Sequence, residues 1–181
     1  RRHVEQVRRL ALQLFEQLGE KIGCGKEERA LLEYAALLHD VGQLVSYRGH
    51  HKHSAQLILN ADRLGFNAHD RVLVALISRY HRKAGPSKKH EAFARLTPED
   101  QGIVRRISAL LRVADGLDRG HTSAVETIRT RLMEDKLIVS VAPRLARADV
   151  GLEVWAAGRK ADVLEKVLKR EVEVKAVNSE R

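Results

Sequence analysis

Apolar residues at helical spacing are the feature of this sequence that most restricts its fold. Over residues 2–18 they recur every three or four positions, which places them along one face of a helix. Gly19, Gly23 and Gly25 then interrupt the pattern. The same spacing predicts further helices, the last of them short. These cover residues 26–39, 53–64, 67 or 69 to 80, 101 to 114 or beyond, and 123–132.

The pattern changes near the C-terminus. Residues 137–141 and 151–155 are short apolar runs typical of strands, and residues 143–149 are expected to connect them. A helix over 162–170 and a strand over 171–174 follow. The sequence therefore predicts a mostly α fold, a helical bundle with a small C-terminal α+β appendage. We place the boundary between two domains, 1–133 and 134–181.

Composition limits the kind of core and the kind of partner. Aromatic residues make up only 4%, so the core consists mainly of aliphatic side chains, which favours helix packing. The net charge of +9 favours polyanionic partners such as polyphosphate or nucleotides, or else reflects a solvated basic surface. Few aromatics disfavour stacking on single-stranded nucleic acid. The lone Cys24 excludes disulfides and thiolate-rich zinc sites within one chain.

The N-terminal residues and the hydropathy of the sequence indicate a part of a longer protein and its cellular location. The sequence opens on Arg1-Arg2-His3 inside a predicted helix and lacks an initiator Met, so we expect a piece of a longer protein. No signal peptide is visible in it, and no apolar run reaches the roughly 18 residues that a membrane span needs. With the single cysteine, this favours a cytoplasmic protein.

The pair His39-Asp40 ends an apolar helix and is the first candidate for chemistry. Adjacent imidazole and carboxylate groups at a helix terminus can turn towards one metal ion. The alternative is a capping Asp beside a His that the helix dipole stabilises.

Two other residues strengthen the metal interpretation. His3 lies beside the apolar face of the first helix, and Asp115 ends a strongly apolar helix. A buried carboxylate needs a partner or a metal, although a salt bridge from Asp115 to Arg112 or Arg119 would also satisfy it.

The order of these residues on three helices resembles the HD superfamily of metal-dependent phosphohydrolases. The resemblance implies that His3, His39, Asp40 and Asp115 hold a divalent ion (Mn, Mg, Fe, Co, Ni or Zn). In two-metal members, further histidines complete a second site, and here His50 and His81 match best, with His51 and His53 as substitutes. Alternatively, these histidines contact phosphate directly. The remaining histidines, His69, His90 and His121, are expected to lie on the surface.

Four stretches narrow the resemblance to the C-terminal region of the exopolyphosphatase and guanosine pentaphosphate phosphatase family. They are LLEYAALLHDVG (31–42), GHHKHSA (49–55), SRYHRK (78–83) and LRVADGLDR (111–119). In that family an N-terminal actin-like module with glycine-rich loops hydrolyses polyphosphate, and no such loop occurs here. The C-terminal region of many members has lost the HD ligands and serves to bind polyphosphate and to dimerise, whereas this sequence keeps all four ligand types.

Two functions follow from the resemblance. One is metal-assisted hydrolysis of a phosphoester or phosphoanhydride, with polyphosphate or a nucleotide polyphosphate as substrate. The other is a non-catalytic module that binds polyphosphate for the missing N-terminal domain, with a homodimer as an open alternative. For the enzyme, the expected catalytic residues are Asp40, His81 and Arg82, and the expected substrate-binding residues are Lys52, His53, Arg79, Lys83 and Arg119.

Overall fold

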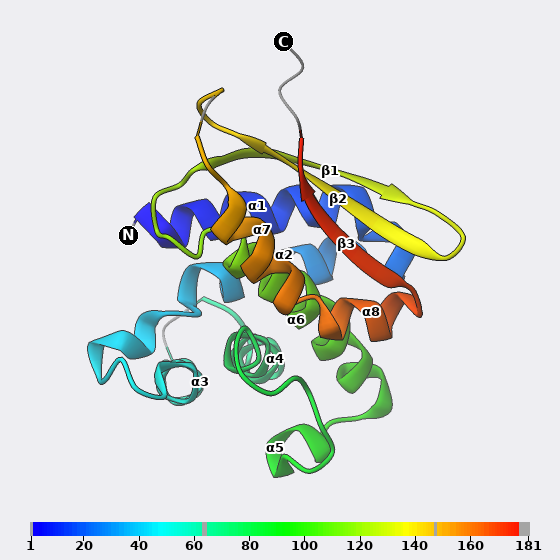
Figure 1. Ribbon diagram of the computed structural model, residues 1–181. Coiled ribbons are helices and arrows are strands. Elements are labelled where there is room, and N and C mark those ends of the chain that lie inside the picture. Colours follow the sequence, from blue (N-terminus) through cyan, green and yellow to red (C-terminus); the bar gives the residue numbers. More distant parts are fainter. Residues whose placement is uncertain (1, 63–64, 147, 178–181) are drawn as a thin grey trace.

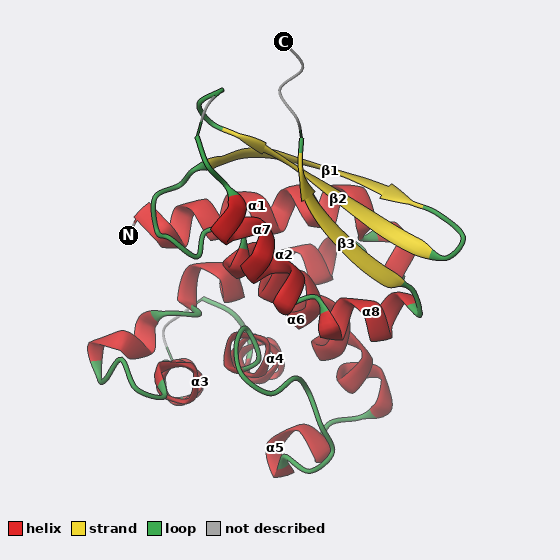
Figure 2. Cartoon of the chain, viewed as in Figure 1, coloured by secondary structure: helices red, strands yellow, loops and turns green. Residues whose placement is uncertain are grey.

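Helices build most of this protein, as predicted. The computed structural model describes residues 2–62, 65–146 and 148–177. Figures 1 and 2 show a bundle of helices with one small sheet packed against it. In chain order the helices before the sheet are α1 (Arg2–Leu18), η1 (Glu20–Ile22), α2 (Lys26–Leu38), η2 (Val41–Leu44), α3 (His50–Leu59), α4 (Ala68–Arg79), α5 (Glu91–Ala94) and α6 (Pro98–Gly116).

The sheet has the order β1-β2-β3. Strands β1 (Val125–Leu132) and β2 (Lys136–Pro143) form an antiparallel hairpin, and β3 (Glu171–Ala176) pairs in parallel with β2. Helices α7 (Gly151–Arg159) and α8 (Asp162–Leu168) make the crossover from β2 to β3. Helix α6 lies centrally and contacts α1, α2, α4, α7 and α8, while α1 also packs against β1.

Local sequence explains the main helix boundaries. Most of the apolar face of α1 is fully buried, and the helix ends at Leu18, just before Gly19, where a Cβ would lie 2.7 Å from the carbonyl oxygen of Phe15. Thr97 caps α6 by accepting a hydrogen bond from the amide of Asp100, with Pro98 in the first turn of the helix. Helix α3 begins at His50 and ends at Leu59, so the predicted start at His53 and the predicted end at Leu64, which lies outside the described residues, are both wrong.

The helix predicted over 123–132 is wrong, because this segment is strand β1. Val125 and Ile128 are buried at a spacing of three, which imitates one turn of a helix. The cause is an irregular register between Val125 and Thr127, which face Pro143 and Ala142 on β2. Such an irregularity adds one residue to one strand and interrupts the alternation of a regular strand.

The strand predicted over 151–155 is also wrong, because these residues open helix α7. The segment predicted to link two strands, residues 143–149, therefore starts at the last residue of β2 and leads to α7. The apolar run 151–155 does not reveal a helix, because two of the three residues on the buried face of α7 lie beyond it. The buried face consists of Glu153, Ala156 and Ala157. The small side chains of the two alanines allow close packing on α6, where a Cβ on Gly116 would lie 2.7 Å from the Cα of Ala157.

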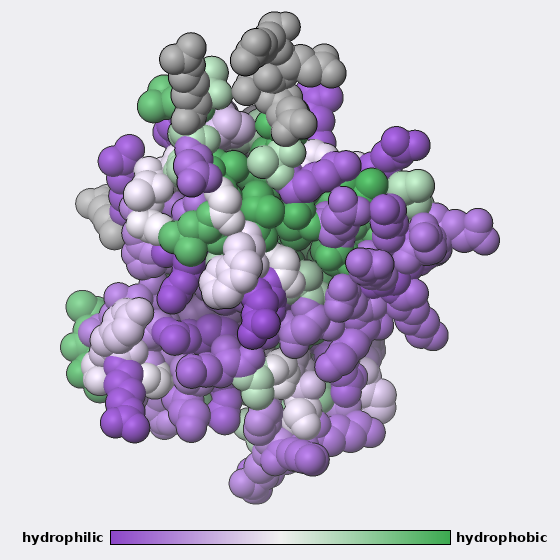
Figure 3. Space-filling model, in the orientation of Figure 1, coloured by the Kyte–Doolittle hydropathy of each residue, from purple (hydrophilic) through white to green (hydrophobic). Residues whose placement is uncertain are grey.

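The boundary at 133/134 falls in the turn between β1 and β2, and the division into two domains stays a prediction. Within the described ranges, no helix is both long and apolar enough to cross a membrane. On the face drawn in Figure 3, hydrophilic residues predominate over α3 and α4, whereas hydrophobic residues gather nearer the sheet. The exposed apolar side chains Leu145, Leu152 and Trp155 belong to the segment that contains α7.

Candidate metal centre

The ends of several helices bring six candidate ligands to one cavity. His3 lies in the first turn of α1, His39 caps the C-terminus of α2, and His50 begins α3. Asp115 lies near the end of α6. The cavity has a volume of about 210 Å³, and its walls include His3, Asp40, His50, His81 and Asp115, with His39 buried behind them.

A close approach of two segments fixes the turn that carries His39 and Asp40. The hydroxyl of Ser54 donates to the carbonyl oxygen of His39 at 2.6 Å and accepts from the amide of Gly42 at 2.9 Å. A Cβ on Gly42 would lie 2.2 Å from the carbonyl oxygen of His50. Glycine at this position therefore lets α3 lie against the turn, which places Asp40 beside His50.

The orientation of the histidine rings follows from the bonds at Nδ1. A backbone carbonyl can only accept, so an Nδ1 facing one carries the proton and leaves the Nε2 lone pair available. Metal-binding histidines commonly have such a second partner. His39, His50 and His81 bond in this way to Ala36 (2.7 Å), Tyr47 (3.0 Å) and Ser78 (2.7 Å).

His3 has a carboxylate in place of the carbonyl. Its Nδ1 lies 2.8 Å from Oδ2 of Asp118, a residue that is completely buried. The second oxygen of Asp118 accepts from the amide of Ser123 at 2.8 Å, so this carboxylate is held from both sides. The ring of His3 thus also presents Nε2 to the cavity.

Two pairs of Nε2 and carboxylate oxygen atoms lie at the mutual distance expected around a metal ion, and a third pair is somewhat wider apart. Ligands bound at about 2.1 Å are separated by roughly 3.0 to 3.4 Å. His3 Nε2 lies 3.3 Å from Asp115 Oδ1, and His39 Nε2 lies 3.7 Å from the same oxygen. His50 Nε2 lies 3.1 Å from Asp40 Oδ1. These atoms form two groups that could each hold an ion, His3–His39–Asp115 and Asp40–His50–His81.

Asp40 connects the two groups. Its Oδ1 faces His50, and also His39 and His81 at 3.7 and 3.8 Å, while its Oδ2 lies 3.7 Å from Nε2 of His3. The buried Nε2 of His39 has no hydrogen-bond partner among the described residues. An unpartnered buried nitrogen is costly, and a metal ion would satisfy it. The donor set therefore fits one divalent ion in each group.

Electrostatics divide the site into cationic and neutral histidines. Burial lowers the pKa of His3, but its hydrogen bonds to Asp115 and Asp118 outweigh this and raise the pKa to about 9. Burial lowers the pKa of His39, and that of His81 falls well below the ordinary value. Burial raises the pKa of Asp115, but Lys160 and the nearby imidazoles hold it well below its usual range. His39 and His81 are therefore neutral, as metal ligands must be.

Basic residues surround the metal ligands. Arg82, Lys83, Arg119 and Lys160 line the same cavity, and Lys160 contacts Asp115. A neighbouring cavity of about 430 Å³ shares Lys83 with it, and no acidic residue among the described ones lines this second space. Its other walls are His51, Lys52, Arg79, Tyr80, Ala84 and His90.

The expected substrate-binding residues are thus divided between two spaces. Lys83 and Arg119 lie at the metal ligands, Lys52 and Arg79 lie in the neighbouring cavity, and His53 lines neither. Of the two substitute ligands, His51 belongs to the second cavity. The expected catalytic residues, Asp40, His81 and Arg82, all line the first cavity.

The structure supports neither a helix-capping role for Asp40 nor a salt bridge between Asp115 and Arg112. Asp40 makes no capping hydrogen bond to any part of the chain that is described. Asp115 pairs with Lys160, not with Arg112, whose guanidinium contacts Asp162 at 2.9 Å.

Three contributors to the site were missed. Asp118 lies one helical turn beyond Asp115 in a stretch that had been singled out, so its spacing could have indicated it. His121 is exposed as expected, but its ring stacks on His3 with centroids 3.8 Å apart. Lys160 comes from the predicted appendage, and nothing in the sequence pattern ties it to Asp115.

Comparison with known proteins gives one family. The family described as Ppx/GppA phosphatase, domain III, matches residues 1–146. A guanosine-5'-triphosphate,3'-diphosphate pyrophosphatase from Aeromonas salmonicida is 30% identical over 149 residues, 78% of this chain and 28% of that protein. The protein of the same name from Vibrio vulnificus is 29% identical over 171 residues, 88% of this chain and 32% of the relative. In Pseudoalteromonas atlantica the corresponding protein is 32% identical over 112 residues, 61% of this chain and 22% of its own length. The chain therefore spans less than a third of the length of these curated relatives.

Proposed function

Because this chain belongs to the Ppx/GppA phosphatase family, we propose that its helical region is a metal-dependent phosphohydrolase centre that acts on polyphosphate or guanosine polyphosphates. One observation carries the proposal. Four imidazoles have Nδ1 held by an acceptor and turn Nε2 towards two carboxylates in one cavity. Such convergence is costly without a cation at the neutral rings of His39 and His81, because their lone pairs and the carboxylate oxygens repel one another. At His3, a bound metal ion would take the place of the proton.

Different residues would bind the metal ions and the substrate. His3, His39 and Asp115 would hold one divalent ion, His50 and His81 a second, and Asp40 would contact both. When bound, such ions lower the pKa of a coordinated water and polarise a phosphoryl oxygen. Arg82 lies 3.3 Å from Nε2 of His50, at the edge of the presumed ligand group, where its guanidinium would bind phosphoryl oxygens and neutralise developing charge.

The neighbouring basic cavity supports a long or multiply charged substrate. Lys83 belongs to both cavities, so a chain of phosphates could extend from the metal ligands to Lys52 and Arg79. Burial and the adjacent cationic groups lower the pKa of His51 to about 4, which keeps this ring neutral beside the anion path. The names of the relatives add guanosine polyphosphates as a substrate class.

The proposal is tested by metal content and turnover. The tag-free chain is assayed for bound metal and for hydrolysis of polyphosphate, guanosine polyphosphates and a generic phosphoester with Mn²⁺, Mg²⁺ or Co²⁺. We expect metal-dependent turnover that Asp40→Asn abolishes. Asp135→Asn makes the same chemical change at an exposed turn and is expected to retain activity. Absence of metal binding at micromolar concentration would refute the metal centre.

The alternative function is a binding module that holds polyphosphate for an N-terminal catalytic domain. The second cavity favours it, since Lys52 and Arg79 line that space and none of the presumed metal ligands does. Tight polyphosphate binding without turnover of any of these substrates would support the module and reject the enzyme. Binding should then weaken as salt concentration rises, by analogy with the counterion release that accompanies protein–nucleic acid association. Dimerisation through this region stays a prediction.

A further inference from the structure

The segment that joins α6 to β1, residues 117–124, covers one of the presumed metal ligands. The ring of His121 stacks on the ring of His3, with centroids 3.8 Å apart and an angle of 6° between the planes. In the same segment, Oδ2 of Asp118 lies 2.8 Å from Nδ1 of His3. The segment therefore holds the His3 ring at one face and at one edge, and its conformation decides how His3 faces the metal cavity.

Two residues of this segment have a left-handed backbone although neither is glycine. The angle φ is 55° at His121 and 56° at Ser123. Such conformations persist where the surrounding contacts hold them. The amides of Ser123 and His121 donate to the side chain and to the carbonyl oxygen of Asp118, at 2.8 and 3.0 Å. Both bonds lie inside the segment, so they do not attach it to the rest of the fold.

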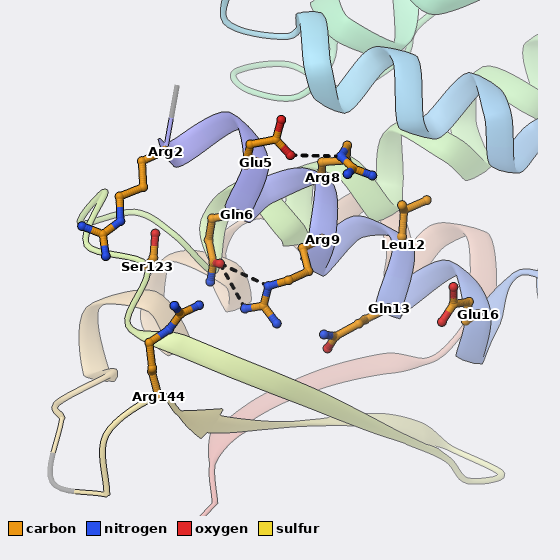
Figure 4. A pocket seen from close by; sticks show the side chains of 10 residues that line it. All are labelled: Arg2, Glu5, Gln6, Arg8, Arg9, Leu12, Gln13, Glu16, Ser123 and Arg144. Carbon is orange, nitrogen blue, oxygen red and sulfur yellow. Dashed lines mark hydrogen bonds and ion pairs between the residues drawn. The ribbon is translucent and has the colours of Figure 1, made fainter.

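The C-terminal end of the segment is attached to α1. Gln6, one helical turn beyond His3, donates to the carbonyl oxygen of Val125 at 2.6 Å, where β1 begins. Figure 4 shows Gln6 and Ser123 among the residues that line a cavity of about 480 Å³ between α1 and this end of the segment. These contacts fix the residues after His121, whereas the turn before His121 needs a contact from another element.

Helix α7 supplies this contact through Glu153. Oε1 of Glu153 accepts a hydrogen bond from the amide of Gly120 at 3.0 Å. A Cβ on Gly120 would lie 2.9 Å from the same oxygen, so glycine allows the close approach. Glu153 is only 3% exposed, and a buried carboxylate is costly unless it accepts hydrogen bonds. Its place in the first turn of α7, at the positive end of the helix dipole, offsets part of this cost.

Helix α7 is itself fixed against the helix that carries Asp115. The backbones of α6 and α7 approach closely at Gly116, where a Cβ would lie 2.7 Å from the Cα of Ala157. At the other end of α7, Lys160 contacts Asp115. Both ends of this helix therefore touch residues of the candidate metal centre or of the segment that covers it. The family match extends over residues 1–146 and does not reach this helix.

We propose that Glu153 is a positioning residue of the metal centre, which orients His3 through its hydrogen bond to Gly120. The bond fixes the turn before His121, and this turn places the His121 ring on one face of His3. An imidazole that is oriented in advance binds a metal ion more tightly, because less ordering is needed on binding. The inference rests on the proposed function, since it assigns the role to His3 as a metal ligand.

The test compares two substitutions of Glu153 by NMR and by calorimetric titration with Mn²⁺. We expect Glu153→Ala, which removes the acceptor, to lose the ¹H–¹H NOE between the rings of His3 and His121. It should also weaken Mn²⁺ binding at the group His3–His39–Asp115 by about tenfold. Glu153→Gln keeps an oxygen that can accept from Gly120, so it should retain the NOE and bind Mn²⁺ within about threefold of the unmodified chain.

Two further variants separate the hydrogen bond from a general effect on stability. Glu99→Ala removes an exposed acid from the first turn of α6 and should change neither the NOE nor Mn²⁺ binding. Gly120→Ala places a Cβ against Oε1 of Glu153 and should reproduce the effects of Glu153→Ala from the other side of the bond. Because Gly120 is exposed, this variant tests the contact even where Glu153→Ala fails to fold.

The NOE is measured on the metal-free chain, so it decides the inference without metal binding or turnover. If Glu153→Ala and Gly120→Ala keep the NOE and only unfold at lower urea concentration, Glu153 stabilises the fold alone and the inference is overturned. Loss of the NOE in Glu153→Gln as well would also overturn it, because the hydrogen bond would not be the cause. Absence of Mn²⁺ binding by the unmodified chain would refute the proposed function, whereas loss of the NOE in Glu153→Ala would still support the positioning of His3.

Discussion

The Nε2 atoms of His50 and His81 lie only 3.3 Å apart. Both rings place Nδ1 against a backbone carbonyl, so two lone pairs face each other across this distance. Oδ1 of Asp40 lies 3.1 Å from one of these nitrogens and 3.8 Å from the other. A divalent ion between the three groups could be coordinated by all of them, and for this reason we propose that they hold the second metal ion.

His50→Ala is expected to remove the second ion and to leave the first. His3, His39 and Asp115 form their own group, and none of the three depends on His50 for its orientation. Metal analysis after equilibrium dialysis should fall from two divalent ions per chain to one. His69→Ala, which removes an exposed histidine outside the cavity, should keep both. Unchanged metal content in His50→Ala would contradict this ligand assignment.

Lys160→Met is expected to destabilise the metal-free protein more than the metal-bound protein. Lys160 contacts Asp115 and helps to keep the pKa of that carboxyl low. Without the ammonium group, a largely buried carboxylate loses a charged partner, at a cost of about 1–3 kcal/mol. A bound divalent ion supplies positive charge at the same carboxylate, so the loss should shrink when metal is present.

Urea unfolding with EDTA and with saturating Mn²⁺ measures this difference. Lys136→Met removes an exposed lysine that pairs with Glu173, and it should change stability little in either condition. An equal loss for Lys160→Met with and without metal would show that Lys160 stabilises the fold but does not share Asp115 with the ion.

Sequence patterns predicted the parts of the site that lie next to helix ends. His39, Asp40 and Asp115 all follow long apolar runs, whose periodicity fixes both the helix and its end. Strand β1 could not be predicted in this way, because the spacing of Val125 and Ile128 results from pairing with β2. Register between strands is a long-range property, and a short window of sequence does not contain it.

The contribution of Lys160 was hidden for a related reason. It caps helix α7, whose position on α6 depends on close contact between Gly116 and Ala157. Neither small residue stands out in a single sequence. Contacts between distant segments therefore decide which basic residue meets Asp115, whereas spacing along the chain suggested Arg112 or Arg119.

The pKa of His69 offers a test of how α4 meets α6. Its Nε2 lies 3.0 Å from Oδ1 of Asp100, and this hydrogen bond raises the pKa of His69 above its ordinary value of 6.5. A raised pKa stabilises the folded state fully below pH 6.5, and the contribution is lost as pH rises through the folded-state pKa. Because His69 is exposed, the change in stability should be small.

An NMR titration of the His69 ring gives this pKa directly. In Asp100→Asn the pKa should fall back towards the ordinary value, with circular dichroism to confirm that the helices persist. Asp62→Asn, which alters an exposed aspartate that pairs with Arg71, should leave the titration of His69 unchanged. The same pKa in Asp100→Asn and in the unmodified chain would contradict the contact.

Gly42→Ala is expected to weaken metal binding although Gly42 is not a metal ligand. The added Cβ would lie 2.2 Å from the carbonyl oxygen of His50 and 2.4 Å from the amide of Ser54, so α3 must move away from the turn that carries Asp40. Overpacking of this kind costs about 1–3 kcal/mol, and displacement of His50 from Asp40 should weaken binding of the second ion.

Gly158→Ala, in helix α7, adds a methyl group that meets no described atom within 4 Å and should stabilise the fold by about 0.4–1 kcal/mol. Urea unfolding and calorimetric titration with Mn²⁺ on both variants measure the two effects. Metal affinity that is equal in Gly42→Ala and Gly158→Ala would show that the close approach at Gly42 does not position the ligands.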